Sequence, residues 1–243
     1  VVSGQKHPAL AVVDIDGDGW DDLYVMPRMG RNQLLRNRHD GTFEDVAARY
    51  GLDLDSHFAA AVFADLDNDG DLDLIAGRTI GASQYLVNEG GTYVARPDLV
   101  DSPLPEHVTS VSAADVNGDG LLDVYLSTYL AQAQKILWRM KKKTGKHPSE
   151  KGIKALMRLL PREAALGVAE RLKSFDIDET MRNRPGPPNI LLLNAGGGRL
   201  RRAPAGDHEA WRNTFQASFA DIDDDGDPDL YLANDFASNT ILR

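Results

Sequence analysis

The sequence predicts an all-β fold built from β-propeller blades, about three and a half repeats of roughly 50 residues with four strands in each repeat. Three observations predict it. An acidic motif of nine residues recurs along the chain, an apolar stretch ending in Asn follows it at the same offset in the first two copies, and short apolar runs flank each copy. Self-similarity at a fixed period is the sequence signature of a repeat architecture.

The acidic motif occurs four times, as DIDGDGWDD, DLDNDGDLD, DVNGDGLLD and DIDDDGDPD. The copies begin at Asp14, Asp65, Asp115 and Asp221, at intervals of 51, 50 and 106 residues. The apolar stretches end at Asn37, Asn88 and Asn194, so the offset from the leading aspartate is 23 residues in the first two repeats and 79 in the third. The third repeat therefore carries an insertion of 56 residues, and the fourth would place its Asn one position after Arg243.

Short strands are predicted on both sides of each acidic motif, because the apolar runs are brief and are bounded by Gly, Asp or Asn. The first and second strands are expected at 10–13 and 23–26, 61–64 and 72–76, 111–114 and 124–126, and 219–220 and 230–233. QLLRN, QYLVN and ILLLN form third strands, and 42–46 and 92–95 are fourth strands after glycine-containing turns. Four short strands per repeat favour a propeller blade over a linear array or an open sandwich.

The chain divides into three predicted parts. Residues 1–129 hold propeller blades with the first three acidic loops, 130–188 form a helical basic insertion, and 189–243 complete the third blade and begin the fourth with its loop. Apolar residues of the insertion recur at helical spacing. Its segment 135–184 has 14 Lys/Arg against 6 Asp/Glu, a net charge of +8. Because the whole chain has a net charge of −10, the rest of it carries −18. Cations are the expected partners of that acidic body.

The acidic motif D-x-[DN]-x-D-G-x-x-D has the features of a calcium loop. Oxygen ligands at positions 1, 3 and 5 point inward as the chain curls, Gly at position 6 permits the turn, a carbonyl at position 7 adds a ligand and an acid closes the site. Oxygen-only ligands favour Ca²⁺ over Mg²⁺, which demands a small octahedron. We therefore expect up to four structural Ca²⁺ ions.

The predicted ligands comprise side chains at positions 1, 3, 5 and 9 and the carbonyl at position 7. They are Asp14, Asp16, Asp18, Trp20 and Asp22; Asp65, Asp67, Asp69, Asp71 and Asp73; Asp115, Asn117, Asp119, Leu121 and Asp123; and Asp221, Asp223, Asp225, Asp227 and Asp229. Asn117 removes one charge from the third site, which we expect to be the weakest. The alternative is that the Asp-Gly runs are solvated turns. Four copies in register argue against it.

A catalytic metal centre is the other alternative for clustered aspartates. It would need sites that differ and a nearby base, whereas the four loops are near copies and the six histidines show neither H-x-x-x-H nor H-E-x-x-H spacing. G-x-S-x-G is absent as well. We therefore expect no enzymatic activity from this chain.

At these motifs the sequence resembles the FG-GAP/VCBS repeat family, whose calcium-binding blades also occur in the integrin α-chain propeller. NQLLRNRHDGTFEDVA and FADIDDDGDPDLYLANDF resemble its ASPIC/UnbV, cartilage-acidic-protein-like branch. The resemblance implies a secreted seven-bladed propeller used for adhesion or recognition. Only about three and a half repeats are present and the C-terminal ASPIC segment is missing, so we expect the sequence to be a portion of a longer protein.

The predicted function is that of a calcium-stabilised extracytoplasmic β-propeller that recognises another protein or a cell-surface component. The alternative is a non-catalytic propeller domain of a larger secreted or periplasmic enzyme, a hydrolase or a redox-complex subunit. The insertion at 132–184 is the favoured partner-binding element, because propeller loops carry recognition. We expect no nucleic-acid partner, and no window is apolar enough for a transmembrane segment. Cysteine is absent, which excludes disulfides.

Overall fold

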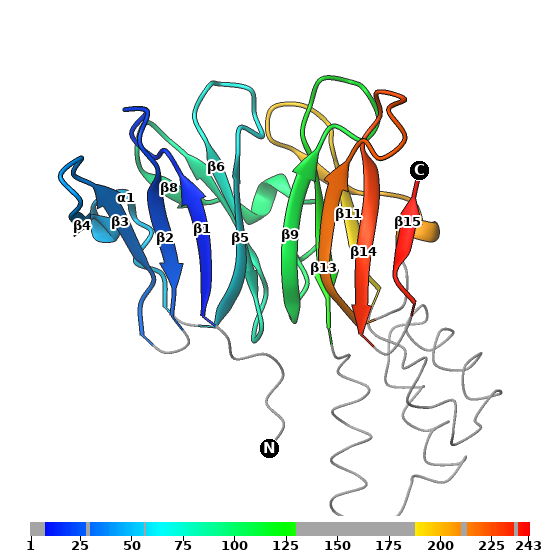
Figure 1. The fold of residues 1–243 in the computed structure, drawn as a ribbon, viewed down its shortest axis with the longest axis horizontal. Coiled ribbons are helices and arrows are strands. Elements are labelled where there is room, and N and C mark those ends of the chain that lie inside the picture. The colour runs from blue at the N-terminus through cyan, green and yellow to red at the C-terminus, as the bar shows by residue number, and fades with distance from the viewer. Residues whose placement is uncertain (1–7, 28–29, 56, 130–187, 210–212, 236–237) are drawn as a thin grey trace, which may run out of the picture.

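The computed structural model describes residues 8–27, 30–55, 57–129, 188–209, 213–235 and 238–243. These residues form four antiparallel sheets that follow one another along the chain (Figure 1). The first three sheets have four strands and the fourth has three in the order of the sequence. The sheets are β1(Ala9–Val13), β2(Asp22–Met26), β3(Gln33–Asn37) and β4(Phe43–Asp45); β5(Phe58–Ala64), β6(Asp73–Arg78), β7(Gln84–Asn88) and β8(Tyr93–Ala95); β9(Val108–Ala114), β10(Asp123–Thr128), β11(Ile190–Asn194) and β12(Leu200–Arg202); and β13(Asn213–Ala220), β14(Asp229–Asp235) and β15(Thr240–Leu242).

The predicted all-β architecture of successive propeller-type blades is confirmed, and the three third strands occupy the predicted residues. Helical structure among the described residues is limited to α1(Ala47–Tyr50) and the short 3₁₀ turns η1(Pro97–Leu99) and η3(Asp207–Glu209). Several first strands begin earlier than predicted, most clearly β13, for which only 219–220 was expected. Its polar residues Gln216 and Ser218 interrupt the apolar run, but the ladder with β14 continues through both.

The sheets stack face to face, with β1, β5, β9 and β13 side by side along the row (Figure 1). A separate apolar core fills each space between neighbouring sheets. Between the first two sheets, the Phe63 ring meets Tyr24 and Tyr93 edge to face. Aromatic pairs in this geometry add to the stabilisation from buried area. The apolar residues of each blade thus become a core only when the next blade covers them.

Polar contacts between β9 and β13 fix the register of the third sheet against the fourth. Ser112 Oγ donates to the carbonyl of Ala217 over 2.7 Å, and Ser110 Oγ accepts from the N–H of Ala217 over 3.0 Å. Thr109 Oγ1 donates to the carbonyl of Thr214 over 2.6 Å. These hydroxyl side chains provide hydrogen-bond partners for backbone groups between the two sheets that would otherwise be buried without one.

The outer faces of the first and last sheets remain exposed and apolar. Leu10 and Val12 on β1 point away from the core that Ala9, Ala11 and Val13 contact, and both are more than half exposed. At the other end Tyr231 and Ile241, which are cross-strand partners, are exposed in the same way. Each end of the row therefore presents the kind of face that a neighbouring sheet covers elsewhere in the structure.

The predicted helical insertion at 130–188 lies outside the described residues, apart from Pro188 at its C-terminal border. Its stem is a buried polar junction. Asn189 Oδ1 accepts from the N–H of Thr128 over 2.9 Å, and Asn189 Nδ2 donates to Thr214 Oγ1 over 2.8 Å. The stem leaves the third sheet from the end opposite the acidic loop, because it joins the far ends of β10 and β11.

Candidate metal sites

All four acidic loops connect the first strand of a sheet to its second strand. They consequently lie along the same edge of all four sheets, at the top of Figure 1. The loops follow β1, β5, β9 and β13, the strands that stand closest together. The repeat therefore places four acidic turns side by side on one face of the molecule.

The first aspartate of each loop curls the chain around its carboxylate. In the first loop, Asp14 accepts the N–H of Asp18 over 3.1 Å and of Gly19 over 2.8 Å. Asp18 in turn accepts the N–H of Trp20 over 2.9 Å. The other three loops repeat this pattern from Asp65, Asp115 and Asp221.

Positive φ angles at two positions of every loop make this curl feasible. Position 6 is glycine each time, with φ between 83° and 95°. Position 4 also has positive φ and is occupied by Gly17, Asn68, Gly118 and Asp224. Glycine, asparagine and aspartate are the residues that tolerate this conformation best. The motif therefore specifies the backbone conformation of the loop as well as its candidate ligands.

Three of the loops gather carboxylates closely enough to share a cation. One oxygen from each aspartate at positions 1, 3 and 5 lies within 4.8 Å of the others in the sets Asp14, Asp16 and Asp18; Asp65, Asp67 and Asp69; and Asp221, Asp223 and Asp225. In the second set, Asp67 Oδ1 is buried and has no hydrogen-bond partner among the described residues. A buried acceptor without a donor is costly unless a cation satisfies it. This donor set fits a hard divalent ion.

The third loop differs from the other three, as its sequence predicts. It has two carboxylates, and Asn117 Oδ1 accepts the N–H of Asp119 over 3.0 Å. Asp115 accepts a further N–H, from Gly118 over 2.8 Å. These backbone donors, chiefly Gly120, lower the pKa of Asp115. Its negative charge is thus partly satisfied by the chain itself.

The closing aspartates at position 9 are buried and tie each hairpin together. Asp22 accepts the N–H of Ile15 over 3.1 Å and of Asn37 over 2.7 Å, and Asp73 and Asp123 make the equivalent pairs. Asp229 accepts from Ile222. The four are 4% exposed or less. Their predicted role as ligands stays a prediction, as do the carbonyls at position 7, while the hydrogen bonds give these aspartates a structural role that sequence reasoning missed.

The Asn that ends each third strand donates its backbone N–H to the closing aspartate. In the third repeat, the Asn194 side chain donates to Leu122 O over 3.2 Å and accepts from the Gly196 N–H over 3.0 Å. Asn37 makes the equivalent bonds in the first repeat, and Asn88 accepts from Gly91. The shared offset in the first two repeats signalled this role, because the backbone N–H of this Asn reaches the closing aspartate in each of the first three repeats.

Burial and mutual repulsion act on several of these carboxylates. Desolvation, followed by the charge of Asp18, raises the pKa of Asp16. Desolvation and the charge of Asp69 likewise raise the pKa of Asp67. Desolvation raises the pKa of Asp73 to about 6, with Asp67 contributing. The metal-free loops are electrostatically strained, since the cost falls on the charged forms.

Basic residues approach two of the loops. Arg36 Nε lies 3.6 Å from Asp16 Oδ2, and Arg243 Nη1 lies 3.2 Å from Asp223 Oδ2. In the first loop, His39 Nε2 is 2.8 Å from Asp18 Oδ2, and its ring stacks on Trp20 with centroids 4.7 Å apart. The first loop therefore has an arginine, a histidine and a tryptophan close to its carboxylates.

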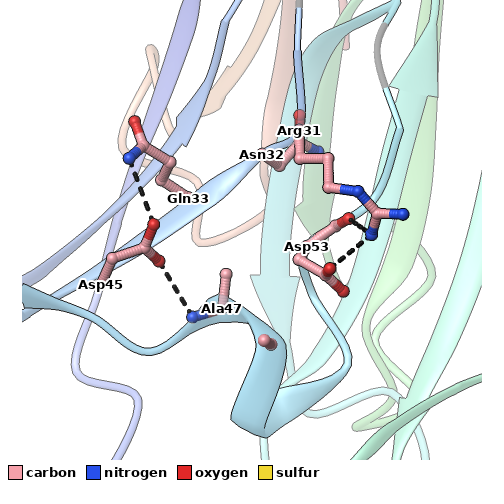
Figure 2. A pocket seen from close by; sticks show the side chains of 7 residues that line it. Arg31, Asn32, Gln33, Asp45, Ala47 and Asp53 are labelled. Carbon is pink, nitrogen blue, oxygen red and sulfur yellow. Dashed lines mark hydrogen bonds and ion pairs between the residues drawn. The ribbon is translucent and has the colours of Figure 1, made fainter.

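A hollow of roughly 400 Å³ lies beside α1 in the first repeat (Figure 2). Four of its polar side chains are paired with one another, and Asn32 Nδ2 donates to the Tyr24 hydroxyl over 2.8 Å. Arg31 contacts Asp53, and Gln33 Nε2 donates to Asp45 Oδ2 over 3.1 Å. Asp45 also accepts the N–H of Ala47. These pairs brace the turn between β4 and β5, so we assign the hollow a structural role.

Comparisons with known proteins agree with the repeat architecture. A family model described as an FG-GAP-like repeat matches residues 14–76, which contain the first two acidic loops. Cartilage acidic protein 1 of Xenopus tropicalis is 29% identical over 122 residues, and its Homo sapiens counterpart is 30% identical over 110 residues. The matches cover 49% and 44% of this chain but only 19% and 17% of those proteins.

Among solved structures, an Agrocybe aegerita lectin described as recognising non-reducing terminal N-acetylglucosamine aligns over 93% of this chain and 46% of its own. The identity is 14% and the TM-score is 0.44, and nothing below rests on this alignment. Within the described residues, no helix has the length and apolarity needed to cross a membrane.

Proposed function

We propose that this chain, an FG-GAP repeat protein of the cartilage-acidic-protein branch, is a β-propeller-like module that binds calcium in its acidic loops and serves extracytoplasmic recognition of a protein or cell-surface component. The observation that carries the proposal is the threefold recurrence of close carboxylate triads in loops of one backbone design. The chain spans under a fifth of the curated relatives that it matches, so the activity of a whole protein is part of the proposal.

The protein's own residues prepare these sites before any ion binds. Backbone N–H groups orient the carboxylates at positions 1 and 5. The buried hydrogen bond from the Asn88 N–H to Asp73 holds the second loop against β7. Bound Ca²⁺ would supply the positive charge that the triads lack. At about 100 times its dissociation constant, an ion stabilises each independent site by roughly 2.7 kcal/mol. The proposed role of calcium is therefore structural.

Recognition is proposed for the module because the site chemistry is uniform. Two of the described histidines support this view: His57 and His107 have positive φ and use their carbonyls to accept the N–H groups of Thr79 and Tyr129. They hold turns together. We assign partner binding to the insertion at 132–184, which leaves from the sheet end opposite the loops. The proposed extracytoplasmic location is supported by the similarity to cartilage acidic protein 1, and it agrees with the proposed calcium binding because calcium is abundant outside the cytoplasm.

The test measures bound calcium and thermal unfolding on the same preparation. Dialysis against Ca²⁺ followed by elemental analysis should find several ions per chain, and EDTA should lower the melting temperature. A protein that retains no Ca²⁺ and melts at the same temperature in EDTA would refute the calcium role. For recognition, cross-linking on an intact cell surface should capture a partner with the full chain and not with the chain lacking 132–184.

A further inference from the structure

We infer that the residue before the Asn of each third strand sets the calcium affinity of the loop in its own blade, so that the second site is the strongest and Arg36 weakens the first. This inference rests on the proposed calcium binding and deepens it. The position is occupied by Arg36, Val87, Leu193 and Arg243 in the four repeats. Two repeats thus place a cation where the other two place an apolar side chain.

The arginines reach the same member of their loops. Arg36 Nε is 3.6 Å from Asp16, and Arg243 Nη1 is 3.2 Å from Asp223, each the aspartate at position 3. Arg36 Nε is buried and makes no hydrogen bond within the described residues. Its guanidinium is therefore held beside the carboxylate by packing and charge. The guanidinium therefore lies close to the place where a dication bound to Asp16 would sit.

Within the part of the chain that the structure describes, the second loop has no such competitor. Val87 is buried in the core between the second and third sheets, and the equivalent aspartate, Asp67, keeps its buried Oδ1 without a partner. The third sheet closes over this loop. Asn194 Nδ2 donates to Leu66 O over 2.7 Å, and a Cβ at Gly198 would lie 3.2 Å from Asp67 Cβ. Low solvent exposure strengthens the attraction between a cation and these carboxylates.

Electrostatics gives the size of the effect. An arginine charge several ångströms from a bound dication repels it, and in largely aqueous surroundings this amounts to about a tenfold loss of affinity. The third site also lacks the arginine, but Asn117 leaves it with two carboxylates at positions 1, 3 and 5, so we expect it to bind more weakly than the second site. The expected order of affinity places the second site first, with the first and fourth sites below it.

Trp20 allows the first site to be measured separately. Its ring stacks on His39, whose Nε2 is 2.8 Å from Asp18 Oδ2. The indole is therefore close enough to the first loop to transfer excitation energy to Tb³⁺ bound there. Luminescence excited through tryptophan and lost in Trp20→Phe reports the first site. Displacement of Tb³⁺ by Ca²⁺ then gives the calcium affinity. Calorimetric titration of the full chain gives the strongest site.

Arg36→Val should tighten Ca²⁺ at the first site about tenfold, and Arg36→Gln should do nearly the same while keeping the polar side chain. Arg36→Lys is the matched control and should leave the affinity near that of the wild type. The reciprocal change, Val87→Arg, should weaken the tightest calorimetric site; if it disrupts the core, Val87→Lys and Val87→Gln separate charge from packing.

Two outcomes are distinguishable. If the wild-type chain binds neither Tb³⁺ nor Ca²⁺, the proposed function fails. If it binds both but folded Arg36→Val and Arg36→Gln show unchanged or weaker Ca²⁺ affinity, the inference about the arginine is wrong. A tightest site that belongs to the first loop in the wild type would also overturn it.

Discussion

The side chain of Asn194 in the third sheet donates a 2.7 Å hydrogen bond to the carbonyl of Leu66 in the acidic loop of the second sheet. The two residues are 128 positions apart, and both are buried. The same amide also donates to Leu122 O in its own sheet. One asparagine therefore closes its own hairpin and fastens it to the neighbouring loop.

Replacement of Asn194 by alanine should lower the free energy of unfolding by about 2 to 3 kcal/mol, because it leaves buried carbonyls without donors. Urea denaturation measures the loss. Asn37→Ala is the matched control, since the hydrogen bonds from its side chain to Asp21 O and from the His39 N–H stay within the first repeat and are exposed. Equal losses in the two variants would show that the bond between sheets contributes nothing.

Calcium removal should destabilise the protein through the second loop most of all. Asp67→Ala removes the carboxylate whose Oδ1 is buried without a partner. In this variant the difference in melting temperature between Ca²⁺ and EDTA should shrink, by the equivalent of roughly 2.7 kcal/mol for the loss of one site at 100 times its dissociation constant. Asp98→Ala, an exposed aspartate paired with Arg96, is the control and should keep the full difference.

Gly77 should tolerate no side chain. A Cβ there would lie 2.4 Å from Val108 Cγ1 across the interface between the second and third sheets. Gly77→Ala should therefore cost about 1 to 3 kcal/mol of stability by overpacking. Gly77→Ala combined with Val108→Ala should recover part of that loss compared with the sum of the single variants. Purely additive losses in urea denaturation would contradict the steric explanation.

The calcium-free protein should lose stability as the pH rises toward neutrality. Burial raises the pKa of Asp73 from its ordinary 3.8 to about 6, so folding favours its protonated form. The stabilising contribution is complete below pH 3.8 and disappears as the pH rises through about 6. Urea midpoints in EDTA should fall across this window in the wild type and change less in Asp73→Asn. An equally steep fall in the variant would assign the effect to other groups.

Removing 132–184 and joining the ends with a short glycine-serine linker should leave the blades intact. Thr128 and Asn189 bind each other below the insertion, and Leu126 pairs with Ile190 in the ladder. The melting temperature and the number of bound calcium ions should both remain unchanged. A variant that melts early or loses ions would show that the insertion is part of the blade structure.

The period of the acidic motif and the Asn offset predicted the blades, their third strands and the loop aspartates, because these features depend on local turn chemistry and on alternation within a strand. Sequence reasoning shortened β13, since Gln216 and Ser218 break the apolar run although the ladder with β14 orders them. Sequence reasoning also missed that Asp22 and its equivalents accept backbone hydrogen bonds that tie the hairpin together, because it counted every acid of the motif as an ion ligand.

By itself, the sequence determined the repeat, the positions of the turns and the candidate ligands, since Asp, Gly and Asn at fixed spacing encode a curled loop within a few residues. Only the tertiary structure decided which carboxylates gather into triads and which hold a hairpin together, that Arg36 reaches Asp16, and that Asn194 joins two sheets. These relationships depend on packing between segments up to 128 residues apart, where burial and distance, not local pattern, set the energy.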